Sequence, residues 1–410
     1  MLSGVFYYHF YFNFIHRNDN FETGKETNFS GVVIDEPKTS ESSQSFTISL
    51  MPPLSGKIRI ISGKSPEYDY GDALTLEGTI ESAVSERDIP IAAFPKIKLE
   101  EKHQGFRPYE SLLNFKKKLA EGFKRFLSSD AASLMGGLTF GIRSDFGKDF
   151  KNAMAQSGTT HLVALSGYNI SILVLAISHA LKGFLDRKMV FLIMALVIFL
   201  FVAMVGAEAS VLRAAVMGFF ALLAIETGRQ YQILNAVSFA AALMVMLSPA
   251  SFLTPGFALS FLSLLGIVYL GPLYAKLFKA KKDGGLFDFR GNLATSAAAQ
   301  TAVLPILIIS FNNFSAVGVL ANALILPFVP FTMFLGFLMA GVNFIFPLFT
   351  YLISLLAQII LGYQIFVINF FAKLSFPISL PIPAAVFAIA YYSACVWFVI
   401  SQNPSHKNGQ

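Results

Sequence analysis

The sequence predicts a polytopic α-helical membrane protein of about ten membrane segments, with a small all-β domain near its N-terminus. Three observations predict this fold. Of the 410 residues, 54% are hydrophobic and only 14% are charged, whereas soluble proteins carry about 25% charged residues. Apolar stretches long enough to cross a bilayer recur after residue 160. Short runs of alternating apolar and polar residues are confined to the N-terminal quarter of the chain.

The first 16 residues are apolar and aromatic, and we expect a short membrane segment there. They lack the basic start and the small-residue cleavage site of a secretory signal peptide. Residues 17–106 are polar overall and contain alternating runs at 31–34, 46–50, 57–61 and 73–80, separated by turn residues. Four or five short strands of this kind are typical of a small antiparallel barrel or sandwich.

Residues 107–130 follow a helical rather than a strand period, which predicts an amphipathic helix. Such a helix could lie on a membrane surface, or it could pack against the β domain. The sequence leaves both interpretations open. Its apolar positions are Leu112, Leu113, Phe115, Leu119, Phe123 and Phe126, and its basic ones are Lys116, Lys117, Lys118, Lys124 and Arg125.

Residues 131–403 form the predicted membrane region, followed by a polar tail at 404–410. Charged residues become rare after residue 131, and each candidate span has about twenty apolar residues. The longest candidate contains Pro327 and Pro330, so we expect a broken or tilted helix there. The candidate spans are residues 160–182, 188–206, 208–226, 232–249, 257–275, 293–311, 315–345, 347–373 and 384–402.

The basic loops predict the orientation of this region. Three loops that contain lysine or arginine follow every second span, whereas the loops at 206–208 and 249–255 contain neither residue. The positive-inside rule places the basic loops in the cytoplasm. Counting back along the chain then places the β domain outside the cytoplasm. The basic residues are Lys182, Arg187 and Lys188, then Arg229, then Lys276, Lys279, Lys281, Lys282 and Arg290.

Arg213 is an ionisable residue inside a predicted span, and Glu208 lies near the outer end of the same span. Inserting such a charge at mid-bilayer costs about 2.5–3.5 kcal/mol. One interpretation is that Arg213 reaches up to the lipid headgroups. The other is that it faces an aqueous path for an anion, and a phosphate would suit its two-pronged guanidinium.

A second polar group lies where a loop becomes a membrane helix: His161, Ser166, Gly167 and Asn169. A serine near a histidine invites a nucleophile interpretation. A separation of five residues does not place the two on one helix face, however, and no carboxylate is near in sequence. We therefore predict no catalytic residue. The lone cysteine, Cys395, cannot build a zinc site, and we predict no metal and no cofactor.

The same segment resembles a known family. The sequence HLVALSGYNI at 161–170 resembles the HLLAISGLHI signature of ComEC-type competence proteins, the inner-membrane DNA channels of bacterial transformation. Further segments agree in order and spacing. They are GLTFG at 137–141, similar to GLLLG; SVLRA at 210–214; GFALSF at 256–261, similar to GFQLSF; and GVLAN at 318–322 followed by Pro327, similar to G..AN....P.

This resemblance implies a fold and a function. The family has an outward-facing OB-like domain with a GD.V...G turn, which matches Gly71 and Asp72 through Gly78 here. It implies a channel in the bacterial cytoplasmic membrane that imports single-stranded DNA. Exposed aromatic side chains of the β domain would stack on bases, with Tyr68, Tyr70 and Phe94 as candidates. His161, Ser166, Gly167, Asn169, Arg213, Glu208 and Asn322 would line the channel or form its motifs.

Two departures from the family pattern bear on mechanism. Many members have a second histidine where this chain has Asn169. Many also end in a metallo-β-lactamase-like domain, whereas this sequence ends at Gln410 without clustered His and Asp residues. We therefore expect a channel without its own nuclease domain. Its partners would be single-stranded DNA, membrane lipids, a separate DNA receptor, a nuclease and a cytoplasmic ATP-driven helicase. The helicase would supply the driving force, because the chain has no Walker-type loop.

Alternatives remain open at this point. A transporter for a smaller anionic solute also fits broken helices and a lone arginine. A family member that has lost its uptake role fits as well.

Overall fold

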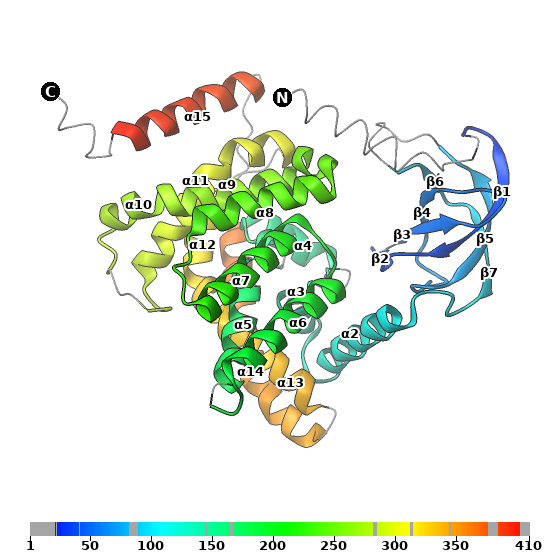
Figure 1. Cartoon of the computed structure of the whole chain (residues 1–410), viewed down its shortest axis with the longest axis horizontal. Helices are drawn as coiled ribbons and strands as arrows, with labels where there is room; N and C mark the ends of the chain where they lie inside the picture. Colours follow the sequence, from blue (N-terminus) through cyan, green and yellow to red (C-terminus); the bar gives the residue numbers. More distant parts are fainter. Residues whose placement is uncertain are drawn as a thin grey trace. The chain divides into compact units, whose positions relative to one another are not determined.

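The computed structural model describes residues 21, 23–40, 42–81, 89–143, 146–163, 167–181, 183–281, 285–311, 315–343, 346–375 and 384–401. The predicted N-terminal segment at 1–16 and the tail at 404–410 lie outside these residues. The chain divides into two compact units (Figure 1). Unit 1 comprises Met1–Glu121 with Ile142–Gly147, and unit 2 comprises Gly122–Gly141 with Lys148–Gln410.

Unit 1 contains the predicted all-β domain. Its strands run in the order β6-β4-β3-β1-β5-β7, and β2 pairs with β3. The pairing of β4 with β6 is parallel, and the other strand pairings are antiparallel. A bridge between Glu81 and Ile91 also joins the chain after β5 to β6. The strands are β1 (Glu26–Val33), β2 (Lys38–Thr39), β3 (Ser43–Leu50), β4 (Lys57–Gly63), β5 (Ala73–Thr79), β6 (Ile91–Ala93) and β7 (Lys96–Glu101).

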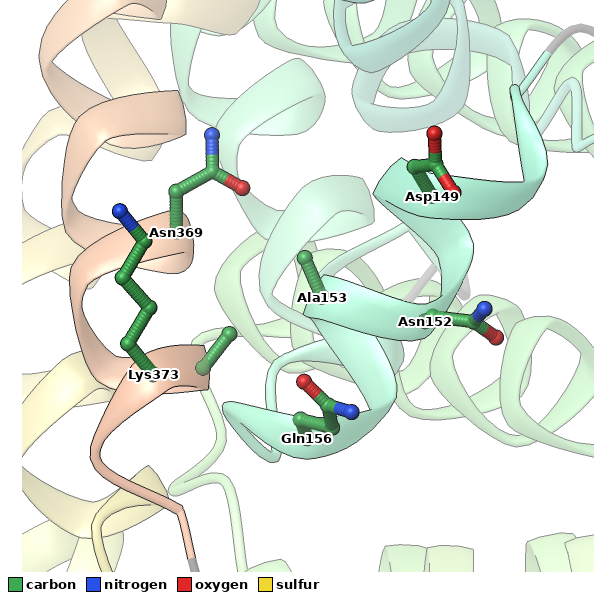
Figure 2. Close-up of a pocket in the computed structure, with 7 residues that line it drawn as sticks. Asp149, Asn152, Ala153, Gln156, Asn369 and Lys373 are labelled. Carbon is green, nitrogen blue, oxygen red and sulfur yellow. The ribbon is translucent and has the colours of Figure 1, made fainter.

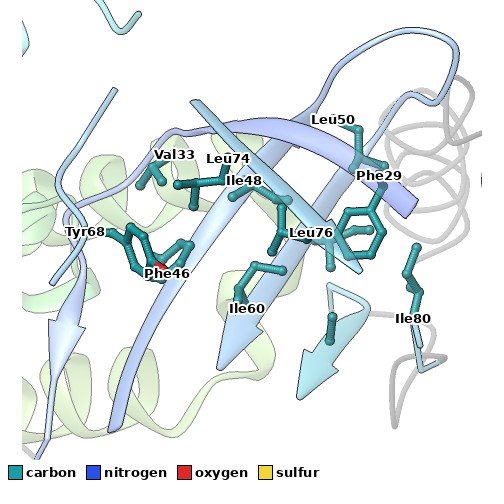
Figure 3. Packing of buried hydrophobic residues seen from close by; sticks show 12 residues of the cluster. Phe29, Val33, Phe46, Ile48, Leu50, Ile60, Tyr68, Leu74, Leu76 and Ile80 are labelled. Carbon is teal, nitrogen blue, oxygen red and sulfur yellow. The ribbon is translucent and has the colours of Figure 1, made fainter. Parts of the chain in front are cut away.

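The core of this domain follows from strand alternation, because successive side chains point to opposite faces. On β4, Ile58 and Ile60 are fully buried, while the neighbouring Lys57 and Arg59 are exposed. The buried side chains of the neighbouring strands gather on the same inner face (Figure 3). The cluster comprises Phe29, Val33, Phe46, Ile48, Leu50, Ile58, Ile60, Tyr68, Leu74, Leu76, Ile80 and Ala92.

Helix α2 (Arg107–Phe126) is the predicted amphipathic helix. Its unit 1 part packs against the β domain, while Lys117 and Lys118 stay exposed. Lys116 Nζ lies 2.7 Å from Glu36 Oε2, and Lys117 Nζ lies 2.9 Å from Asp69 Oδ1. Tyr109 also meets the Tyr70 ring edge-on, with 4.8 Å between the ring centroids. Of the two interpretations that the sequence left open, the structure shows packing on the β domain.

Unit 2 is helical. Its elements are α3 (Ser129–Phe140), α4 (Lys148–Gln156), η1 (Thr160–Leu162), α5 (Gly167–Leu181), α6 (Arg187–Val205), α7 (Ala209–Thr227), α8 (Ile233–Leu247), η2 (Pro249–Leu253), α9 (Pro255–Tyr269), α10 (Gly271–Leu277), α11 (Phe289–Phe311), α12 (Gly318–Ile325), η3 (Leu326–Phe328), α13 (Val329–Val342), α14 (Pro347–Lys373) and α15 (Ala384–Ser401), where η marks a short 3₁₀ helix.

Five helical segments among the described residues are long and apolar enough to cross a membrane: α6, α7, α11, α12 with α13, and α14. A sixth is present if α9 and α10, bent by 51° at their junction, form one span. These candidate spans are consistent with the predicted polytopic membrane protein. The predicted total of about ten stays a prediction, because helices such as α5 and α8 have only 15 residues each.

The predicted break in the longest span is present. Pro327 lies in η3 between α12 and α13, and Pro330 lies in the first turn of α13. A proline cannot donate a backbone hydrogen bond inside a helix, so the short 3₁₀ turn accommodates the break.

Helix α3 is a buried element that the sequence analysis did not predict as a separate helix. Its last ten residues are buried without interruption. The chain enters unit 2 in the last turn of α2, where a Cβ atom at Gly122 would lie 3.1 Å from Asn343, just beyond the end of α13. From there α3 passes Gln358, which hydrogen-bonds Ser128, and leads towards α4. The sequence analysis counted membrane spans back from the one that begins at residue 160, and that count did not include α3.

One of the close helix contacts involves a glycine of α9. A Cβ atom at Gly266 of α9 would lie 2.5 Å from Ala302 Cβ and 2.7 Å from the Ala298 carbonyl oxygen, both on α11. Small residues let membrane helices approach this closely, and packing replaces the hydrophobic effect as the force between them. Gly266 therefore sets the distance between α9 and α11.

We predict that Gly266→Ala lowers the midpoint of thermal unfolding of the purified protein in detergent, because the added methyl group forces the two helices apart. Gly362→Ala in α14 is the matched control, since no atom lies within 4 Å of its Cβ position. That control is expected to leave the midpoint unchanged or to raise it, because alanine favours a helix over glycine by about 1 kcal/mol. Equal effects of the two substitutions would contradict the packing role of Gly266.

Candidate functional site

Asn169 links the start of α5 to α3. Its Nδ2 atom donates a hydrogen bond to the Leu138 carbonyl oxygen at 3.0 Å, and its side chain is 2% exposed. Leu138 belongs to the GLTFG segment and Asn169 to the HLVALSGYNI segment. The structure therefore brings these two segments together and gives Asn169 a structural hydrogen bond.

The turn after α4 meets the start of α12. Gly158 has a positive φ of 70°, which favours glycine. A Cβ atom at Gly318 would lie 3.1 Å from the Ser157 carbonyl oxygen and 3.3 Å from the Gly158 Cα atom. The hydroxyl groups of Ser157 and Thr159 are 2.7 Å apart and fully buried. Two segments about 160 residues apart in sequence thus cross without room for a side chain between them.

His161 and Ser166 are not shown as a pair by the structure. His161 lies in η1 and its side chain is exposed, whereas Ser166 lies outside the described residues. Gly167 is the first residue of α5. Within the described ranges, no group of three or more His, Cys, Asp or Glu residues could hold a metal ion.

Arg213 lies on α7 and faces α9, and it is 8% exposed. Its guanidinium carbon lies 5.8 Å from the centroid of the Phe261 ring, within the range of a cation–π contact. In the part of the chain that the structure describes, its Nε atom has no hydrogen-bond partner. Arg213 is thus buried rather than extended to the surface. Glu208, which precedes α7, is exposed.

Asn322 is buried on α12, one turn beyond Gly318. Its Oδ1 atom has no hydrogen-bond partner among the described residues. On the facing helix α11, Gln300 donates from Nε2 to the Ser315 carbonyl oxygen at 2.9 Å. The oxygens Gln300 Oε1 and Ser296 Oγ, one helical turn apart, have no partner within the described ranges. The sequence analysis missed Gln300 and Ser296, although a polar residue inside an apolar span was the available signal.

A pocket between α4 and α14 was also missed by the sequence analysis. Its volume is about 390 Å³, within the usual range for small-ligand pockets. In Figure 2, Ala153 and Gln156 lie on the side of α4 that faces Asn369 and Lys373 of α14. The complete lining is Asp149, Asn152, Ala153, Gln156, Asn369, Ala372 and Lys373.

The three aromatic candidates of the β domain differ in exposure. Tyr68 is only 6% exposed, and its ring packs 5.5 Å from that of Phe46. It is therefore a core residue, and the expectation of an exposed stacking surface at Tyr68 is wrong. Tyr70 is partly buried against Tyr109, and its hydroxyl accepts a hydrogen bond from the Phe106 amide at 3.2 Å. Phe94 is 67% exposed, as a stacking residue must be.

The outer face of β2, β3 and β4 carries cations and hydroxyl groups. Antiparallel pairing places Arg59 opposite Thr47 and Lys57 opposite Ser49. Residues directly opposite each other have side chains on the same face. Lys38 of β2 pairs with Ser45 on that face as well, and all three basic side chains are exposed.

Comparison with known proteins identifies the family. The model of the Competence protein family matches residues 138–404, well over half of the chain. The chain belongs to this family. The matched range contains the motif residues that the structure joins through Asn169 and Leu138 and through Arg213 and Phe261. It also contains Gly318, which packs on Gly158.

One curated relative of this chain is the ComE operon protein 3 of Bacillus subtilis (strain 168). The two are 26% identical over 227 residues, which cover 55% of this chain and 28% of that protein. The match thus spans less than a third of the length of the relative. No solved structure matches the chain.

Proposed function

We propose that this competence family protein is the channel that passes single-stranded DNA across the cytoplasmic membrane during natural transformation. The observation that carries the proposal is a set of buried polar atoms without partners inside apolar helices, in the described part of the family domain. Each such atom costs about 1–3 kcal/mol, a cost that a path for a polar substrate explains. The atoms are Arg213 Nε, Ser260 Oγ, Ser296 Oγ, Gln300 Oε1, Asn322 Oδ1 and Gln364 Oε1.

In this proposal the path groups replace part of the hydration of the DNA phosphates without holding them tightly. Arg213 supplies a positive charge, and its delocalised guanidinium suits phosphate oxygens. His161, Ser166, Gly167, Glu208 and Asn322 border the path. In this proposal a DNA receptor, a nuclease and an ATP-driven helicase act as separate partners. Membrane lipids surround the helices.

A transporter of a smaller anionic solute is the second candidate. The break at η3 and the 51° bend between α9 and α10 favour it, since discontinuous helices often form transporter sites. A β domain with an exposed basic face favours the DNA channel, because a small solute needs no landing surface.

We further propose that the β domain is OB-like and that it receives the strand. Its pairing supports this, because β1, β3 and β4 are antiparallel neighbours, β6 is parallel to β4, and β5 lies beside β1. OB-folds bind oligonucleotides on the face of their second and third strands, which correspond here to β3 and β4. That face carries Lys38, Lys57 and Arg59. Phe94, whose amide donates to the Ile61 carbonyl oxygen at the end of β4 at 2.7 Å, is the stacking candidate.

The uptake prediction concerns cells in which the gene is deleted and then restored. Deletion is expected to stop labelled DNA from entering the cytoplasm, and the wild type is expected to restore entry. Arg213→Ala should reduce entry at least tenfold, because the path loses its buried charge. Arg229→Ala, an exposed arginine just beyond α7, is the control and should restore entry fully. Unchanged DNA entry after deletion would rule out the channel and favour the small-solute transporter.

The DNA-face prediction concerns the purified full chain and a labelled oligonucleotide. Lys57→Ala with Arg59→Ala should weaken binding and reduce the slope of log affinity against log salt by about 1.4, since each lost phosphate contact removes about 0.7. Phe94→Ala should weaken binding by about 1–3 kcal/mol without changing the slope. Lys96→Ala, whose side chain pairs with Glu77 on another strand pair, is the control. Binding that ignores Lys57, Arg59 and Phe94 would exclude this face.

The orientation prediction tests on which side of the membrane the β domain and the basic loops lie. We propose that the β domain is extracytoplasmic, and the charge rule places the basic loops in the cytoplasm. In a Cys395→Ser background, Lys98→Cys on β7 should react with an impermeant maleimide in intact cells. Lys281→Cys in a basic loop should react only after lysis. If Lys98→Cys also requires lysis, the landing role of the domain is excluded.

A further inference from the structure

The pocket between α4 and α14 lies at the end of a membrane span. Lys373 is the last residue of α14, and α4 leads directly into the turn at Ser157 and Gly158 that meets α12. The pocket thus adjoins the turn that packs against the start of the GVLAN segment at 318–322.

The lining chemistry is polar and mixed. Asn152, Gln156 and Asn369 supply three amides, each with a donor and an acceptor group. Lys373 supplies an ammonium group and Asp149 a carboxylate. No salt bridge joins either charged group to another residue in the described ranges, so both can meet a ligand. The apolar residues of the lining are Ala153 and Ala372, and the carbon atoms of the longer side chains add further apolar surface.

This combination matches a nucleotide. Amides pair with the edges of bases because each presents a donor and an acceptor side by side. A carboxylate accepts from the amino group of cytosine. A lysine contacts phosphate without sequence preference. A zwitterionic lipid headgroup would satisfy Lys373 and Asp149, but it has no paired donor and acceptor edge to meet the amides.

We propose that this pocket holds one nucleotide of the single strand as it passes the end of α14, with Lys373 on the phosphate and Gln156 and Asn369 on the base. The proposal rests on the proposed function of the chain. The lining contains no aromatic residue, so the base is held by hydrogen bonds without stacking. Weak holding suits a strand that must move on.

The test measures binding of a fluorescent oligonucleotide to the purified full chain in lipid nanodiscs. Lys373→Ala, Gln156→Ala and Asn369→Ala are each expected to raise the Kd at least fivefold. Lys373→Ala should also reduce the slope of log affinity against log salt by about 0.7, the value for one lost phosphate contact. The amide variants should leave that slope unchanged, and Lys373→Arg should retain it.

Lys148→Ala is the matched control, because this exposed lysine lies on α4 beside Asp149 but does not line the pocket. It should bind as the wild type does. Thermal unfolding midpoints of all variants show whether each is folded. If the three pocket variants bind DNA as the wild type does, the inference is wrong. If they do so while losing phospholipid in native mass spectrometry, the pocket is a lipid headgroup site instead.

Uptake in cells separates this inference from the proposed function. Unchanged DNA entry after gene deletion overturns the channel itself. Loss of entry on deletion, with full restoration and full DNA binding by Lys373→Ala and Asn369→Ala, leaves the channel standing and overturns the pocket. Reduced entry and weaker binding with both variants, but not with Lys148→Ala, supports the nucleotide site.

Discussion

The absence of water inside the bilayer is the constraint on which the rest of unit 2 depends. Backbone polar groups there must be paired within the protein, which leaves helices as the available structure. Helices without a hydrophobic force between them associate by close packing, and Gly266 against Ala298 and Ala302 shows how close that packing becomes. The same constraint makes each unpartnered polar side chain costly. Such a side chain therefore marks a place where the structure serves something other than its own stability.

This distinction sorts the motif residues of the family into two groups. Asn169 is buried and bonded to the Leu138 carbonyl oxygen, and Gly158 and Gly318 allow two segments to cross. These residues hold the fold. Arg213 and Asn322 are buried with an atom that has no partner among the described residues, and packing alone does not account for them. In the proposed channel, the second group contains the residues that the DNA strand contacts.

The β domain of unit 1 is subject to a different constraint, because one face of its sheet is exposed to solvent. Alternation sends apolar side chains into a single core and leaves a face of hydroxyl groups and cations outside. Lys116 and Lys117 of α2 pair with Glu36 and Asp69, so two basic side chains of that helix form ion pairs within unit 1. Lys38, Lys57 and Arg59 lie elsewhere, on the outer face of the sheet.

The sequence by itself determined the membrane class, the all-β domain, the break at Pro327 and the family, because composition, periodicity and short motifs are local properties of the chain. It also singled out Arg213, since an ionisable residue in an apolar span is visible without a fold, and Asn322, through its place in a family motif. Only the tertiary structure decided that Tyr68 is a core residue, that α3 is buried, and that Gln156 and Asn369 share a pocket with Lys373. Burial and proximity depend on which distant segments pack together, and a one-dimensional pattern does not contain that information.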